Sequence, residues 1–140
     1  MEKVINILLA EDDQLDVMNI KRTLDKMNIL YQLHETKNGE EAIDKLKALE
    51  AEGADKLPDF VLLDINMPRM DGLELLSVIR AHETWKHLKC FVITTSVEKV
   101  DKQKAKSLGV SGYIVKPLRL TNPTSMDAFN LMIDLLNEKS

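Results

Sequence analysis

Short apolar runs alternate with longer amphipathic segments along the whole chain. The apolar runs, rich in Val, Ile, Leu and Phe, are typical of strands buried on both faces of a parallel sheet. They occupy residues 4–10, 59–64, 91–94 and 112–115, and residues 30–35 show a weaker strand pattern. Between them, apolar residues recur every three or four positions, which is the spacing of one helix face. Helices are therefore predicted at residues 13–27, 39–49, 72–82, 98–108 and 125–137.

Five strands in strict alternation with five helices predict an α/β fold. Parallel strands joined by right-handed crossovers place helices on both faces of the sheet. We therefore expect a doubly wound five-stranded parallel sheet with five helices, in the flavodoxin-like strand order 2-1-3-4-5. In this order the first and third strands are neighbours, so the residues that follow them meet at one edge of the sheet.

Length and composition predict a single domain over residues 1–140. A chain of 140 residues with 44% hydrophobic content can bury one core but is too short for two ordinary domains. Lys116 directly follows the last predicted strand, and the 24 residues after it are enough for one helix. They are too few for a helix-turn-helix unit, so we expect no output domain.

Charge and hydropathy exclude several kinds of partner. A net charge of -4 and a pI near 5.4 disfavour binding of nucleic acid through a basic surface. No apolar run approaches the length of a membrane span, and the first residues lack the features of a signal peptide. The single cysteine, Cys90, excludes an internal disulfide and fits a reducing compartment. We expect a cytoplasmic protein that binds neither nucleic acid nor membrane.

Polar and charged residues follow four of the predicted strands, at the edge of the sheet where ligands of such folds bind. In chain order they are Glu11, Asp12, Asp13, Asp64, Asn66, Thr94, Thr95, Ser96 and Lys116. The carboxylates of Glu11, Asp12 and Asp64 would converge and repel one another unless a cation neutralised them. Because Mg²⁺ prefers oxygen ligands, the cluster predicts a magnesium site.

Two further residues would lie across the crevice from these acids. Lys116 offers a positive charge and Thr94 a hydroxyl group, and both suit the oxygens of a phosphoryl group. Together with the acids and a metal ion, they indicate phosphoryl transfer to a carboxylate. Asp13 and Asp71 have a simpler explanation, because each precedes a predicted helix and is suited to cap it.

Four sequence blocks resemble the signature blocks of response regulator receiver domains of two-component signalling. The blocks are ILLAEDD (7–13), LLDINMPRMDG (62–72), VITTS (92–96) and GVSGYIVKP (109–117). They occur in the family's order and together span most of the chain. The resemblance implies a stand-alone receiver, similar to chemotaxis regulators, that acts as a phosphoacceptor switch and not as an enzyme.

The resemblance also implies a role for each matching residue of the acidic cluster. Asp64 corresponds to the aspartate that is phosphorylated, in a reaction that depends on Mg²⁺. Glu11 and Asp12 correspond to the acid pair that holds the metal ion, although many family members have Asp at the first position. Asn66 corresponds to the residue whose main-chain carbonyl completes the metal site.

The remaining matches imply a conformational switch. Thr94 corresponds to the switch hydroxyl, Tyr113 to the switch aromatic residue and Lys116 to the lysine that pairs with the phosphoryl group. The donor would be a sensor histidine kinase or a histidine phosphotransfer protein. The face built from residues 98–108, 112–115 and 125–137 would then bind a downstream protein target. The residues leave open whether two copies form a homodimer through this face.

Other functions fit the residues less well. A phosphatase of the haloacid dehalogenase type needs a second acid at position 66, where this chain has Asn66. A flavin-binding protein needs a phosphate loop after the first strand, where residues 11–13 are acidic and would repel a phosphate. The main alternative is a degenerate receiver that serves only as a protein-docking scaffold. The segment 119–124 is also longer than the turn usual in the family.

Overall fold

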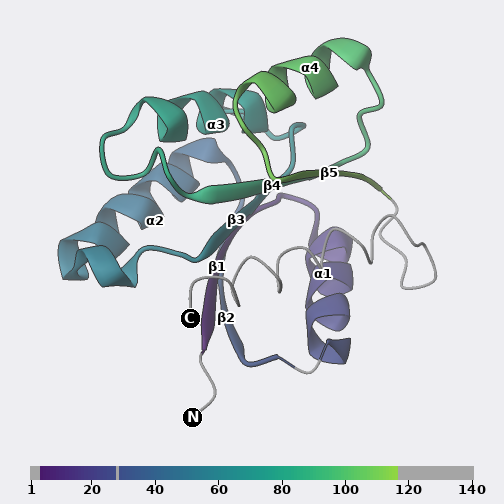
Figure 1. Ribbon diagram of the computed structural model, residues 1–140. Coiled ribbons are helices and arrows are strands. Elements are labelled where there is room, and N and C mark those ends of the chain that lie inside the picture. Colours follow the sequence, from purple (N-terminus) through teal and green to yellow (C-terminus); the bar gives the residue numbers. More distant parts are fainter. Residues whose placement is uncertain (1–3, 28, 117–140) are drawn as a thin grey trace.

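The computed structural model describes residues 4–27 and 29–116, which contain five strands and four α-helices (Figure 1). The strands are β1 (Ile5–Ala10), β2 (Tyr31–Thr36), β3 (Phe60–Leu63), β4 (Lys89–Thr94) and β5 (Gly112–Val115). The helices are α1 (Gln14–Lys26), α2 (Gly39–Glu52), α3 (Gly72–Ala81) and α4 (Lys99–Ser107), with a 3-10 turn at Ala54–Lys56. The helix predicted at 125–137 lies outside the described residues.

The strands form one parallel sheet in the order β2-β1-β3-β4-β5. This confirms the predicted flavodoxin-like arrangement. In the register of the sheet, Ala10 of β1 pairs with Leu63 of β3, and Thr94 of β4 pairs with Val115 of β5. The strands therefore end side by side at one edge, and the residues that follow them are neighbours.

Helices cover both faces of the sheet, as the apolar runs predict. In Figure 1, α2, α3 and α4 lie on one side of the strands and α1 on the other. Alternate residues of β1 follow this division: Leu8 packs into the cluster that contains α2 and α3 side chains, and Ile7 and Leu9 pack with α1. Burial on both faces explains why β1 and β3 are apolar almost without interruption.

Carboxylates fix the first turns of the two helices nearest the strand ends. Asp13 accepts hydrogen bonds from the backbone amides of Leu15 (2.9 Å) and Asp16 (3.3 Å) at the start of α1. Asp71 and Glu74 form a reciprocal capping box at the start of α3. Both predicted caps are confirmed, and α1 and α3 begin at defined positions beside the sheet edge.

Two element boundaries differ from those predicted by more than one residue, and each has a local cause. Helix α2 continues to Glu52 and ends at Gly53, whose φ of 143° is accessible to glycine and strained for other residues. Strand β4 begins at Lys89, two residues before the apolar run, because Lys89 already pairs with Phe60 of β3. Backbone pairing, and not apolar character, sets the start of that strand.

Most of the apolar residues of the described strands lie in the core. Within the described ranges, no helix combines the length and apolar character needed to cross a bilayer. Cys90 is fully buried in the cluster beneath α3, and burial raises the pKa of its thiol to about 11. Its thiol therefore stays protonated and inert, as expected for a small core residue.

Candidate functional site

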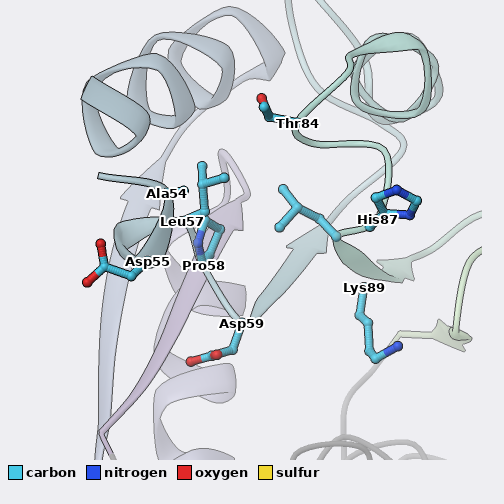
Figure 2. Close-up of a pocket in the computed structure, with 9 residues that line it drawn as sticks. Ala54, Asp55, Leu57, Pro58, Asp59, Thr84, His87 and Lys89 are labelled. Carbon is cyan, nitrogen blue, oxygen red and sulfur yellow. The ribbon is translucent and has the colours of Figure 1, made fainter. Parts of the chain in front are cut away.

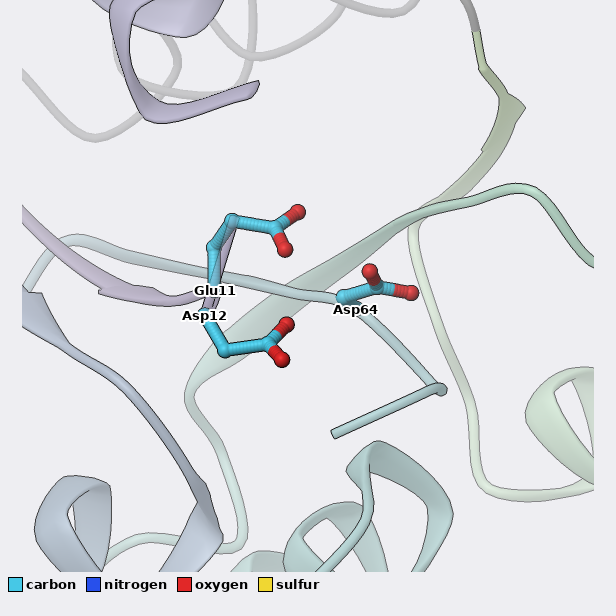
Figure 3. Close-up of side chains that lie close together, drawn as sticks. All are labelled: Glu11, Asp12 and Asp64. Atoms are coloured by element: carbon cyan, nitrogen blue, oxygen red, sulfur yellow. The ribbon is translucent and has the colours of Figure 1, made fainter. Parts of the chain in front are cut away.

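The strand ends bring together acids that are far apart in the chain. Glu11 and Asp12 directly follow β1, and Asp64 directly follows β3, the neighbouring strand. One carboxylate oxygen of each residue lies within 4.8 Å of the others, and the three side chains gather at the same edge (Figure 3). Glu11 and Asp64 are buried and Asp12 is exposed. The predicted acidic cluster is thus present.

The donor atoms of this cluster fit a hard divalent cation. All three are carboxylate oxygens, which suit Mg²⁺ or a similar ion better than ions that prefer nitrogen or sulfur. Among the residues that the structure describes, no other group of three His, Cys, Asp or Glu side chains is close enough to share an ion. One exposed and two buried acids leave the site open to water on one side, as Mg²⁺ requires.

Lys116, the residue after β5, provides the positive charge that the sequence predicts. Its ammonium group donates to Glu11 Oε1 (2.6 Å), Asp64 Oδ2 (2.8 Å) and Asp16 Oδ2 (2.6 Å). The side chain of Lys116 is only 7% exposed, and those of Glu11 and Asp64 are similarly buried. The three N–H donors of the lysine are therefore all used by carboxylates.

Sequence reasoning missed the third of these partners, Asp16. The residue lies in the first turn of α1, where an acid is favoured by the helix dipole alone. Its position three residues after the Asp13 cap turns it toward the sheet edge, within reach of the long lysine side chain. An acid in the first turn of the helix that follows a site strand is the signal that could have identified it.

Burial and charge shift the pKa values of the two central groups. Burial raises the pKa of Glu11 to about 7, Lys116 opposes this shift through its hydrogen bond, and the charge of Asp64 adds to it. Burial lowers the pKa of Lys116, but its hydrogen bonds to Asp16, Asp64 and Glu11 outweigh burial, and the net shift is upward. Lys116 therefore remains positively charged at neutral pH.

Asp64 is held by partners on both carboxylate oxygens. Oδ1 accepts a hydrogen bond from the Asn66 backbone amide (3.1 Å), and Oδ2 accepts one from Lys116. Gly72, the first residue of α3, donates its amide to the carbonyl oxygen of Ile65 (2.9 Å). The chain after β3 thus folds back tightly behind Asp64 and fixes its main chain.

The two predicted switch residues meet at Ser96 and not at the acids. Thr94 is fully buried, and its hydroxyl oxygen accepts a hydrogen bond from the Ser96 amide (3.3 Å). The Tyr113 hydroxyl donates to the Ser96 carbonyl (3.0 Å). Ser96 also donates its own hydroxyl to Asp101 in α4 (2.6 Å). One loop residue therefore connects β4, β5 and α4 beside the acidic cluster.

Neutralising Asp12 should stabilise the cation-free protein. Asp12 is exposed, so Asp12→Asn relieves repulsion from Glu11 and Asp64 by about 0.5 kcal/mol in the presence of a chelator. Urea unfolding in EDTA would measure this gain. Glu11→Gln should show no such gain, because Glu11 is already paired with Lys116. Lower stability of Asp12→Asn would contradict this account of the cluster.

A second concave region lies at the opposite ends of the strands. This pocket of about 290 Å³ is formed by the segments that lead into β3 and β4, with Asp55, Asp59, His87 and Lys89 among its lining residues (Figure 2). Asp59 accepts a hydrogen bond from the Asn6 amide (2.9 Å), which ties the start of β3 to β1. The pocket is lined by both acidic and basic side chains. The predicted phosphoryl-transfer site lies at the opposite edge of the sheet, at the carboxyl ends of the strands.

The sequence of this domain matches a known family. The model of the response regulator receiver domain family matches residues 7–126. The chain belongs to this family. The receiver domain is 36% identical over 112 residues to the probable methanogenesis regulatory protein FilR2 of Methanothrix harundinacea, a match that covers 80% of this chain and 72% of FilR2.

A larger protein and two solved structures are also similar to this chain. The sensor histidine kinase CheAY of Helicobacter pylori is 34% identical over 79% of this chain, which corresponds to 13% of CheAY. The phosphorylated cyanobacterial phytochrome response regulator RcpA is 26% identical, with a TM-score of 0.72 over 95% of this chain and 91% of RcpA. The Mn²⁺-bound response regulator Rcp1 is 27% identical, with a TM-score of 0.70 over 94% of this chain and 91% of Rcp1.

Proposed function

We propose that this receiver domain is a phosphoacceptor switch in which Asp64 receives a phosphoryl group from a phosphohistidine. The observation that carries the proposal is the position of the Asp64 carboxylate. It lies 2.8 Å from the Lys116 ammonium group and belongs to the cluster of acids that can hold a cation. A carboxylate placed between two sources of positive charge is suited to phosphoryl transfer, because these charges stabilise the phosphoryl oxygens.

Glu11, Asp12 and Asp64 would hold Mg²⁺, with the main-chain carbonyl of Asn66 as a further ligand. When bound, Mg²⁺ neutralises negative charge on the phosphoryl oxygens during transfer. The all-oxygen donor set supports this choice of metal. The Mn²⁺-bound form of Rcp1 supports it as well, because Mn²⁺ and Mg²⁺ share a preference for oxygen ligands.

The transfer itself requires little covalent chemistry from the protein. An Asp64 oxygen attacks phosphorus while the P–N bond to the donor histidine breaks, and the electron pair of that bond returns to the imidazole nitrogen. A proton on the other ring nitrogen keeps the leaving imidazole neutral. Lys116 donates a hydrogen bond to the transferred group. We infer that the donor is a sensor histidine kinase or a histidine phosphotransfer protein, in line with the match to a histidine kinase.

Phosphorylation of Asp64 would change the positions of Thr94 and Tyr113. The phosphoryl group attracts the Thr94 hydroxyl, which now accepts a hydrogen bond from Ser96. Because Tyr113 donates to the carbonyl of the same residue, a shift of Ser96 changes the position of Tyr113 and the first turn of α4. The face that contains α4 and β5 would then change its affinity for a downstream protein target.

Labelling with a small phosphodonor tests this function. After incubation with acetyl phosphate and Mg²⁺, the protein should gain the mass of one phosphoryl group, as measured by intact mass spectrometry. Asp64→Asn should gain nothing, and neither should wild type in EDTA. Asp44→Asn, on the exposed face of α2, should be labelled like wild type. Equal labelling of wild type and Asp64→Asn would refute the assignment, and no labelling of either would indicate a docking scaffold.

A further inference from the structure

Lys116 is bound by three carboxylates that come from three different elements. Glu11 follows β1, Asp64 follows β3 and Asp16 lies in α1. Two of these partners, Glu11 and Asp64, also belong to the acidic cluster that can hold a cation, and Asp16 does not. The lysine and a divalent cation therefore share two ligands, whereas Asp16 serves the lysine alone.

Sharing of this kind makes the lysine and the cation competitors. Both are positively charged, and both gain stability from the same two buried acids. A cation that binds Glu11 and Asp64 weakens the hold of these acids on Lys116 and repels its ammonium group. The Lys116 side chain is 7% exposed, so it needs another carboxylate nearby to keep its charge paired.

We propose that Asp16 is a positioning residue that retains Lys116 when a divalent cation takes Glu11 and Asp64, and that it thereby raises the affinity of the site for the cation. The proposal rests on the cation-dependent function proposed above. Its basis is the contact between Asp16 Oδ2 and Lys116 Nζ, at 2.6 Å as short as the contact to Glu11. The Asp16 side chain is 26% exposed, so water offsets part of the cost of placing its charge beside the buried lysine.

The acid belongs to a rigid element, which suits it for this task. Asp16 is the third residue of α1, and its backbone amide is held by the Asp13 cap at 3.3 Å. Its position is therefore set by the helix and does not depend on the loops that follow β3 and β4. Lys116 keeps one fixed partner near the site and stays within reach of a phosphoryl group on Asp64.

A matched pair of substitutions isolates the contribution of Asp16. Asp16→Asn and Asp13→Asn each remove one negative charge from the start of α1, and asparagine caps a helix as well as aspartate does. Within the part of the chain that the structure describes, Asp13 forms no hydrogen bond with Lys116, so Asp13→Asn measures the effect of the lost charge alone. Titration with Mg²⁺, followed by ¹H–¹⁵N NMR spectra, would measure the dissociation constant of each variant.

We expect Asp16→Asn to weaken Mg²⁺ binding about tenfold, and Asp13→Asn to weaken it about twofold. In a Lys116→Met background the two substitutions should have the same small effect, because the residue through which Asp16 acts is gone. Thermal unfolding in EDTA would confirm that each variant is folded. Equal effects of the two substitutions in the presence of Lys116 would overturn the inference.

Two other outcomes are also decisive. If the large effect of Asp16→Asn persists without Lys116, Asp16 acts on the cation directly and the proposed route through the lysine is wrong. If wild type binds no Mg²⁺ at all, the cation-dependent function is wrong, and the role of Asp16 is rejected with it. Binding by wild type with no difference between the two variants would reject the role of Asp16 and leave the function of the site intact.

Discussion

Replacing Gly72 with alanine should both destabilise the domain and impair phosphorylation of Asp64. A Cβ atom at position 72 would lie 2.1 Å from the carbonyl oxygen of Asp64 and 2.8 Å from the Cα atom of Ile65. These are main-chain atoms at the end of β3 and cannot move aside alone. We expect a loss of about 3 kcal/mol in the free energy of unfolding. Displacement of Asp64 by even 1 Å should slow phosphorylation about 100-fold.

Gly109→Ala is a suitable control for this prediction. Gly109 follows Leu108, the C-cap residue of α4, and has a φ of 70°, so alanine there is strained by about 1 kcal/mol. The nearest atom to an added Cβ is nevertheless 3.8 Å away, in Arg80. The Gly109→Ala protein should lose stability and keep its phosphorylation rate. Urea unfolding and the rate of labelling by acetyl phosphate would separate the two effects. Normal labelling of a folded Gly72→Ala protein would show that the end of β3 can relax.

Much of this fold could be predicted because its strands are buried on both faces. The runs of β1 and β3 contain hardly any polar residue, so their ends are marked sharply by Glu11 and Asp64. Parallel pairing then brings these two ends together whatever the details of packing. The acidic cluster and the lysine across from it follow from chain order and strand order, which are properties that a sequence pattern can reveal.

Contacts that depend on how far a side chain reaches could not be predicted in this way. From the sequence, Asp16 is explained as an acid that favours the start of a helix. Only the path of the Lys116 side chain makes it part of the site. From the sequence, Arg80 is explained as a charged surface residue of α3. In the structure its guanidinium group donates to the carbonyls of residues 86, 88, 108 and 109 and so ties α3 to the ends of two loops. From the sequence, Gly72 is explained as the start of a helix. In the structure, the close approach of the Asp64 and Ile65 main chain is what requires glycine there.

Lys116→Met should strongly destabilise the cation-free protein. Methionine retains the length and apolar part of the side chain but leaves Glu11 and Asp64 buried without a counterion. When one partner of a buried ion pair is removed, the desolvation of the remaining charge is no longer compensated and the folded protein is destabilised. We expect a loss of about 3 kcal/mol in EDTA, which corresponds to about 10 °C in melting temperature for a domain of this size.

The same substitution should increase the stabilisation obtained from Mg²⁺, because the cation then replaces the missing charge and has no competitor for the two acids. At 100 times its dissociation constant a ligand stabilises a protein by about 2.7 kcal/mol, so saturating Mg²⁺ should recover most of the loss. Lys21→Met, which breaks an exposed ion pair with Glu35, should change stability little in either condition. Thermal unfolding with Mg²⁺ and with EDTA would compare the three proteins. A Lys116→Met protein as stable as wild type in EDTA would mean that the buried acids are neutralised by protons and not by the lysine.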